Sequence, residues 1–113
     1  PDPTRFMKLH NLWVNYQKKG EYNPMHNHAG IASFAIFIDI PYGPDERDAH
    51  RSNGAFQLEA EVLPVDNSWN GSMLLFPATA NHAVYPYYTS DKERITVAGN
   101  ITWAVEGPDE EHY

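Results

Sequence analysis

The stretch RITVAGNITWAV, residues 94–105, contains the pattern that decides the fold class. One face of an extended chain would carry Arg94, Thr96, Ala98 and Asn100, and the opposite face would carry Ile95, Val97, Ile101 and Trp103. Side chains of a β-strand alternate between two faces with a period of two residues. The stretch therefore predicts a strand with one largely polar face and one apolar face.

Short runs of β-branched and aromatic residues elsewhere predict further strands, separated by Gly, Pro, Asn and Asp turns. These strands are expected at residues 9–16, 31–40, 56–62, 72–76 and 82–88. The almost continuously apolar run 31–40 predicts a central strand buried on both faces, and residues 41–54 predict a surface loop. We therefore expect an all-β sandwich or barrel formed by a single domain, residues 1–113.

The composition excludes several classes of protein and of site. A formal net charge of −7 argues against a nucleic-acid partner, because proteins that bind phosphate backbones carry a basic face. The chain has no cysteine, which rules out disulfides and thiolate ligands. No apolar run is long enough for a membrane helix, and the first residues do not resemble a signal peptide. We expect a cytoplasmic protein (in the host cell, if viral) that binds neither membranes nor nucleic acids.

Six histidines are present, and three of them are placed where they could share a metal ion. His26 and His28 are two residues apart, so in an extended segment both rings would point to one side. His82 follows a turn after the predicted strand that ends at Pro77. Three such ligands leave coordination positions open for water or substrate. Two exposed loop histidines remain the alternative interpretation. The other histidines are expected at the surface: His10, His50 and His112.

Arg94 and Thr96 form a second candidate group on the polar face of the last strand. A guanidinium with a hydroxyl beside it is well shaped to hold a carboxylate. The alternative is a solvated strand face with a surface salt bridge. Because Arg94 follows His82 by twelve residues across one turn, we expect its strand to return beside the histidines.

The sequence at this point resembles the 2-oxoglutarate and Fe(II)-dependent oxygenases of phages and marine bacteria, from about residue 9 to residue 103. The resemblance rests on Trp13-x-Asn15, Gly20, His26-x-His28, Gly71 to Pro77, His82, Arg94-x-Thr96 and Asn100. It implies a double-stranded β-helix (jelly roll, cupin-like barrel) and a dioxygenase that decarboxylates 2-oxoglutarate to succinate while hydroxylating a substrate.

The resemblance also implies roles for individual residues. His26 and His82 would bind Fe(II), and His28 would take the position usually held by a carboxylate, which leaves the site one negative charge poorer. Arg94, helped by Thr96, would bind the distal carboxylate of 2-oxoglutarate. Further polar groups of the pocket would be Asn15 and Asn100.

Two alternatives remain at this point. One is a cupin-like metal protein that binds or acts on a small molecule without 2-oxoglutarate. Gly20 and the His26-x-His28 pair fit the first cupin motif in part, but residues 29–34 lack its glutamate, and Arg94 has no role in it. The other is a non-catalytic barrel that retains the site.

The apolar face of the last strand predicts a cover. An exposed strip of Ile95, Val97, Ile101 and Trp103 would be larger than scattered surface hydrophobes. Helices that precede the barrel would cover it in related oxygenases, and the present chain lacks such a segment. Either an N-terminal region is missing, which would agree with the start at Pro1, or another chain covers the strip. We therefore expect a homo-oligomer or part of a larger assembly.

Overall fold

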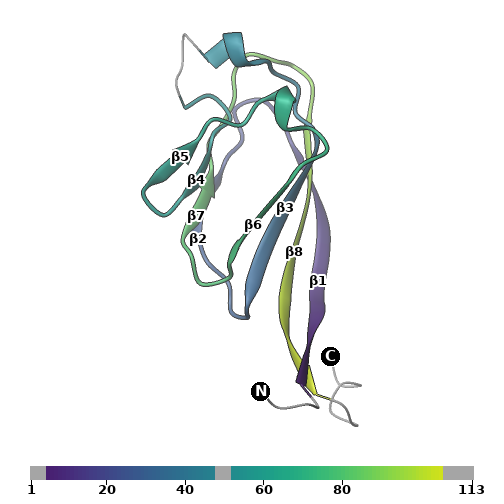
Figure 1. Cartoon of the computed structure of the whole chain (residues 1–113). Coiled ribbons are helices and arrows are strands. Elements are labelled where there is room, and N and C mark those ends of the chain that lie inside the picture. Colours follow the sequence, from purple (N-terminus) through teal and green to yellow (C-terminus); the bar gives the residue numbers. More distant parts are fainter. Residues whose placement is uncertain (1–4, 48–51, 106–113) are drawn as a thin grey trace.

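The computed structural model describes residues 5–47 and 52–105. This part of the chain contains eight β-strands and two short 3-10 helices (Figure 1). The strands are β1 (Arg5–Gln17), β2 (Asn23–His26), β3 (Ala32–Asp39), β4 (Phe56–Leu58), β5 (Glu61–Leu63), β6 (Met73–Pro77), β7 (His82–Val84) and β8 (Arg94–Val105). The 3-10 helices are Pro44–Arg47 and Asn67–Trp69.

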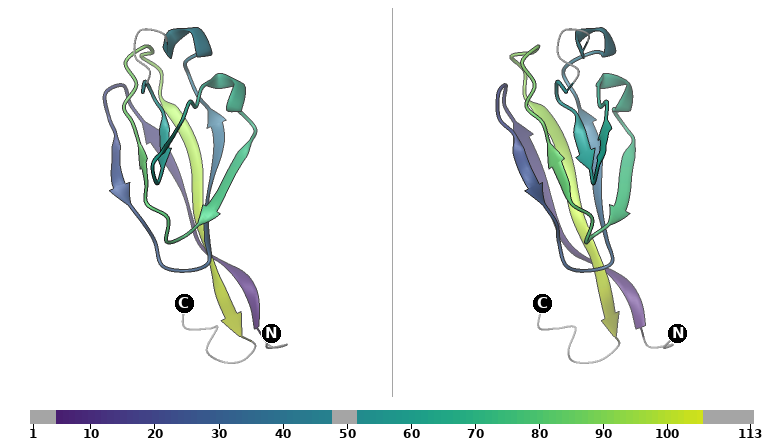
Figure 2. Two further views of the ribbon diagram at one scale, coloured as in Figure 1. Left: turned by 60° about the vertical axis from the view of Figure 1, so that its left-hand side comes forward. Right: turned by 90° about the vertical axis from the view of Figure 1, so that its left-hand side faces the viewer.

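The strands form two four-stranded sheets that face each other (Figure 2). The first has the order β1-β8-β3-β6 and the second has the order β2-β7-β4-β5. The first has the longer strands and is called the larger sheet, and the second is called the smaller sheet. Every strand pair that the structure describes is antiparallel. Successive strands mostly cross from one sheet to the other, and two Greek keys connected in this way make a jelly roll. The predicted all-β, double-stranded β-helix fold is therefore confirmed.

The apolar core lies between the two sheets and toward one end of the sandwich. Ala35 and Phe37 of β3, Phe56 of β4 and Phe76 of β6 point inward between the sheets. The connecting segments close the end with further buried side chains: Ile40, Tyr42, Val65 and Tyr87. The rest of the space between the sheets is not filled by apolar side chains and forms the cavity described below.

Two sequence predictions about β3 and the segment after it were wrong in detail. β3 is buried on one face only, since Ser33, Ala35 and Phe37 are buried while the residues between them are partly exposed. The residues of β3 that point outward are also apolar, so the sequence alone resembled that of a strand buried on both faces. The segment 41–54 is not entirely a surface loop, because Tyr42 and Asn53 within it are buried.

The predicted strand 56–62 is a hairpin, in which β4 turns into β5 at Glu59 and Ala60. Glu59 has a φ of 53°, a conformation that is uncommon outside glycine. The turn is held by Asn81, whose carbonyl accepts from the Glu59 N–H at 2.7 Å and whose N–H donates to the Glu59 carboxylate at 3.0 Å. The strand predicted at 82–88 is also shorter and ends at Val84.

No helix in residues 5–47 and 52–105 has the length and apolarity that crossing a membrane requires.

Gly54 occupies a position where no side chain fits. Its φ is +63°, and a Cβ atom there would overlap the Tyr42 hydroxyl. Its carbonyl accepts hydrogen bonds from the Tyr42 hydroxyl at 2.8 Å and from Nη1 of Arg94 at 2.6 Å. Gly71 has a similar φ of +88°, but no atom lies within 4 Å of the place where its Cβ would be. An alanine at Gly71 would therefore introduce backbone strain alone, whereas an alanine at Gly54 would introduce both backbone strain and steric overlap.

We predict that Gly54→Ala destabilises the fold far more than Gly71→Ala. Both variants place alanine in a left-handed conformation, which costs about 1–2 kcal/mol. Only Gly54→Ala also displaces Tyr42, and overpacking of this kind costs about 1–3 kcal/mol more. Urea denaturation measures both free energies of unfolding. Equal losses in the two variants would show that the packing of Tyr42 on Gly54 is not important for stability.

Candidate metal centre

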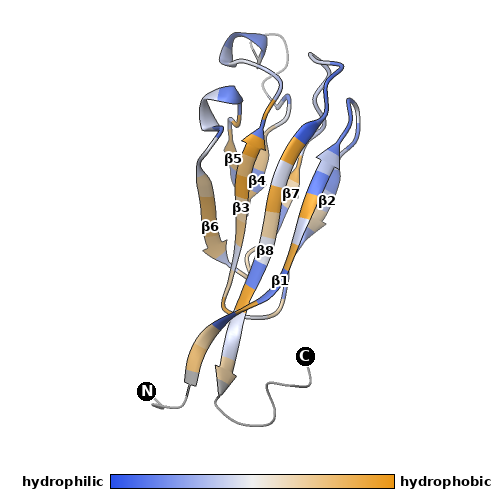
Figure 3. Ribbon diagram, turned by 90° about the vertical axis from the view of Figure 1, so that its right-hand side faces the viewer, coloured by the Kyte–Doolittle hydropathy of each residue, from blue (hydrophilic) through white to orange (hydrophobic). Residues whose placement is uncertain are grey.

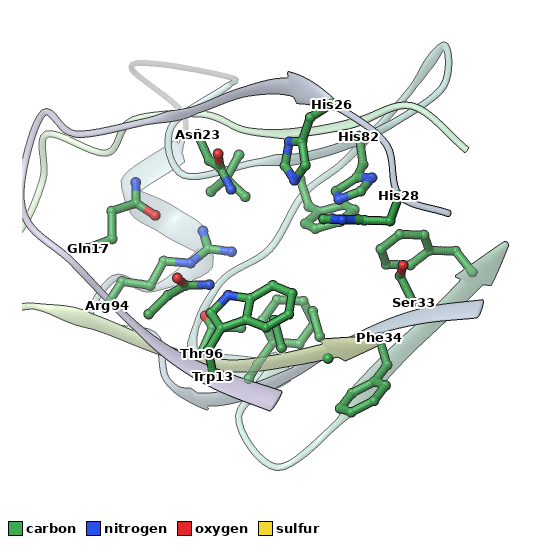
Figure 4. A pocket seen from close by; sticks show the side chains of 18 of the residues that line it. Trp13, Gln17, Asn23, His26, His28, Ser33, Phe34, His82, Arg94 and Thr96 are labelled. Atoms are coloured by element: carbon green, nitrogen blue, oxygen red, sulfur yellow. The ribbon is translucent and has the colours of Figure 1, made fainter. Parts of the chain in front are cut away.

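A cavity of about 330 Å³ lies between the inner faces of the two sheets. The larger sheet contributes polar side chains from β1 and β8, and histidines line the opposite side (Figure 4). Phe56 of β4 also lines the cavity. The exposed residues of the lining, among them Asn15, Tyr22 and Asn23, come from the edge strands β1 and β2 and from the segment that joins them. The cavity therefore opens between these edge strands, and its buried end lies under β3 and β8.

The structure brings His26, His28 and His82 together at one wall of this cavity (Figure 4). His26 ends β2 and His82 begins β7, and the two residues are cross-strand partners. His28 follows β2 in the segment that leads to β3, where its backbone N–H donates to the Ala78 carbonyl at 2.8 Å. One ring nitrogen from each histidine lies within 4.8 Å of the other two.

Two of the three imidazoles are oriented by the backbone. Nδ1 of His26 lies 2.7 Å from the Pro24 carbonyl oxygen, and Nδ1 of His82 lies 3.1 Å from the Ala80 carbonyl oxygen. A carbonyl oxygen can only accept, so each Nδ1 carries the proton and each Nε2 keeps a free lone pair. Metal-binding histidines are commonly fixed by such a bond from the second ring nitrogen.

Aromatic rings surround His82, which is 6% exposed. The Phe56 ring stacks on it with a centroid distance of 5.9 Å and an interplanar angle of 8°, and Phe76 approaches at 4.8 Å. His28 is less buried and lies 6.1 Å from the ring of Trp13. The strand ends and these ring contacts hold the three imidazoles in place from both sheets.

The surroundings of His28 and His82 favour the neutral form of these two side chains. Burial lowers the pKa of His82, an effect that the hydrogen bond to Ala80 opposes in part and that His26 and His28 reinforce. Burial also lowers the pKa of His28, again with help from His26. Neutral imidazole is the form that binds metal ions.

The donor set fits a transition-metal ion. Nitrogen ligands at about 2.0–2.2 Å from a metal lie about 3.0–3.5 Å from one another, so nitrogens that are now up to 4.8 Å apart would have to move closer together to bind one ion. Three neutral nitrogen donors on one side leave coordination positions open toward the cavity. Iron, zinc and copper all accept imidazole, and the three histidines alone do not select among them.

Arg94 lies at the other side of the cavity, at the start of β8 (Figure 4). It is 2% exposed, and no carboxylate of the described residues pairs with it. Its Nη1 donates to the Tyr42 hydroxyl at 2.7 Å and to the Gly54 carbonyl at 2.6 Å. The edge formed by Nε and Nη2 has no bond to any protein group in the part of the chain that the structure describes.

Tyr42 does not neutralise this buried cation. Burial raises the pKa of Tyr42 above its usual 10.0, although Arg94 acts in the opposite direction. The phenol is therefore protonated at neutral pH, and it donates to the Gly54 carbonyl while it accepts from Arg94. The guanidinium is thus held in position but keeps its charge and one free donor edge, which is the arrangement that a carboxylate recognises best.

The other predicted polar residues fall into two groups. Thr96 is buried next to Arg94 on the same face, and Asn15 is its cross-strand neighbour. Asn100 lines the same cavity but lies six residues from Arg94, about 20 Å along the strand. Its side chain accepts from the Ser33 hydroxyl at 2.5 Å and donates to the Asn11 side chain at 2.9 Å.

Sequence reasoning missed the residues that hold Arg94, namely Tyr42 and Gly54. Both lie in the segment that was expected to be a surface loop, and neither forms part of a motif. The predicted surface position of His10 is confirmed, since His10 is exposed. His50 and His112 lie outside the described residues.

A comparison with protein families shows to which family the chain belongs. Residues 11–100 match the model of a family described as "Putative 2OG-Fe(II) oxygenase". Among solved structures, KdgF from Halomonas sp. is similar, with a TM-score of 0.48 and 15% sequence identity over 97% of this chain and 87% of that chain. No curated protein matched the sequence. Because the family model covers most of the chain and includes the three histidines and Arg94, the chain belongs to this 2-oxoglutarate and Fe(II)-dependent oxygenase family.

Proposed function

We propose that the chain is a dioxygenase that binds Fe(II) through His26, His28 and His82 and uses 2-oxoglutarate as its co-substrate. One observation carries the proposal: three convergent imidazoles line the same small cavity as a buried guanidinium that has no acidic partner among residues 5–47 and 52–105. Membership of the family supports the general kind of chemistry. The metal identity, the co-substrate and the reaction itself are our inference.

Each group has a defined task in this proposal. The imidazoles present their Nε2 lone pairs to the metal, and the carbonyls of Pro24 and Ala80 fix two of the rings. Arg94 binds the distal carboxylate of 2-oxoglutarate through its free Nε–Nη2 edge, and the Thr96 hydroxyl lies beside it. When bound, iron and 2-oxoglutarate would supply the oxidative chemistry, while the protein positions them and limits access of water.

The guanidinium of Arg94, which pairs with no carboxylate of the described residues, also favours this proposal over a cupin-like metal protein with an uncharged ligand. Leaving a charge buried without a partner costs several kcal/mol, so such groups persist where an anion binds. A metal protein that takes an uncharged ligand has no use for it. Asn100 lies far from Arg94, so we place it outside the co-substrate region.

We predict one metal ion per chain, and we expect His82→Ala to lose at least nine-tenths of it. His82 is the most buried ligand, and its loss leaves only two donors close together. His10→Ala is the matched control, because His10 is an exposed histidine of β1 outside the site. Elemental analysis after dialysis measures the occupancy. Full occupancy in His82→Ala would show that the ligand assignment is wrong.

We also predict how metal affinity depends on pH. Protons and metal compete for the imidazole lone pairs, and the lowered pKa values of His28 and His82 make protonation harder. Affinity should therefore hold steady as the pH falls from 8 toward 6.5, the ordinary histidine value, and decline only at lower pH. Titration against a chromophoric chelator at several pH values tests this. A tenfold loss between pH 8 and 7 would contradict it.

A third prediction concerns the free edge of Arg94. Arg94→Lys keeps the charge but removes the planar fork, and we expect 2-oxoglutarate affinity to fall by about 2 kcal/mol, or roughly 30-fold. Metal occupancy should stay unchanged, which shows that the fold and the histidines are intact. Calorimetry on the metal-loaded protein measures the affinity. Unchanged binding of 2-oxoglutarate would favour the cupin-like alternative.

A further inference from the structure

Figure 3 shows the larger sheet from the side that points away from the cavity, and apolar residues recur along all four of its strands. The register places the following side chains on this side: Met7, Leu9, Leu12, Val14 and Tyr16 from β1, Ile95, Val97, Ile101 and Trp103 from β8, Phe34 and Ile36 from β3, and Met73 and Leu75 from β6. We call this set the outer apolar face.

Most of this face is open to solvent. Eight of its residues are among the exposed large hydrophobic side chains, with exposures from 44% for Trp103 to 64% for Met7. If a fully exposed residue of this kind has an accessible surface of about 200 Å², the exposed fractions of the eight residues add up to roughly 900 Å² of accessible surface. The largest apolar patch of an ordinary monomer is about 300–600 Å². The outer apolar face therefore exceeds what a soluble monomer usually exposes.

The same area matches what one subunit contributes to a stable interface, which is about 800 Å². Two copies related by a twofold axis present equal patches to each other, as an isologous contact requires. Sheets of this kind pack face to face about 10 Å apart, with interdigitating side chains. The area of the face thus suits a second copy of the chain.

The charge distribution points to the same partner. The chain carries a net charge of −7, so two copies would repel each other through most of their surfaces. The charged positions in register with the outer face lie at its ends: Asp39 pairs with Ile95 at one end, and Arg5 pairs with Val105 at the other. Packing of two such faces would therefore bury no pair of like charges near its centre.

We propose that the outer apolar face is the interface of a homodimer in which the β1-β8-β3-β6 sheets of two copies pack against each other. The cavities then lie on the two outer sides of the dimer, and their openings between β1 and β2 stay accessible. The proposal does not depend on the chemistry of the cavity, and the partner is a second copy of this chain.

Sedimentation equilibrium of the 113-residue chain, from 1 to 100 µM, tests the proposal. The expected result is a dimer of twice the 12.9 kDa chain mass. Leu12→Glu and Leu75→Glu, at positions 56% and 57% exposed on β1 and β6, should each weaken dimerisation at least 100-fold. Val62→Glu is the matched control, because Val62 is 48% exposed on β5 of the other sheet, and it should leave the dimer unchanged.

A wild-type monomer at 100 µM would overturn the proposal, and so would dimers that tolerate both glutamates on the outer face. Loss of the dimer in Val62→Glu alone would place the interface on the other sheet. If the variants misfold, amide hydrogen exchange of the wild type at low and high protein concentration tests the proposal without them. Protection should rise with concentration in β1 and β6 but not in β5, and the reverse pattern would contradict the proposal.

Discussion

The buried guanidinium of Arg94 is the constraint around which this end of the molecule is organised. It ties the first residue of β8 to Tyr42 and to the Gly54 carbonyl, so both ends of the connection between β3 and β4 are held against the larger sheet. Burial of an uncompensated charge costs several kcal/mol. Two neutral acceptors offset part of that cost, and an anion in the cavity would offset the rest. The buried charge that would bind an anion thus lowers the stability of the fold.

The alternation of β8 couples the cavity to the outer surface. Arg94 and Thr96 point inward because Ile95 and Val97 point outward, and a slip of one residue would exchange the two sets. The bulges at His10 in β1 and at Ile38 in β3 absorb an extra residue each while the rest of the register is kept. One strand therefore supplies both the polar lining of the cavity and the middle of the outer apolar face.

The sequence predicted most of the fold and the convergence of the three histidines, but not the residues that hold Arg94 in position. The limits of β8 and the position of His82 at the start of β7 followed from alternation and from the turn after Pro77. The hairpin at Glu59 did not, because it contains no typical turn residue and depends on contacts with Asn81. Tyr42 could not be identified either. Its role depends on Gly54, which lies twelve residues further along the chain and belongs to no motif. The Gly54 carbonyl accepts hydrogen bonds from both the Tyr42 hydroxyl and Arg94.

Three imidazoles in place of two imidazoles and a carboxylate would leave the candidate metal site without a negative charge of its own. The keto-acid carboxylate of 2-oxoglutarate would then offset one of the two positive charges of a divalent ion, and Arg94 would compensate the distal carboxylate, so metal and co-substrate should bind cooperatively. Anaerobic titration of 2-oxoglutarate into the Fe(II)-loaded and the metal-free protein tests this most directly. The account predicts one 2-oxoglutarate per chain, bound at least tenfold more tightly when Fe(II) is present, a coupling of about 1.4 kcal/mol or more. No binding to the Fe(II)-loaded protein, or equal binding to both forms, would contradict it.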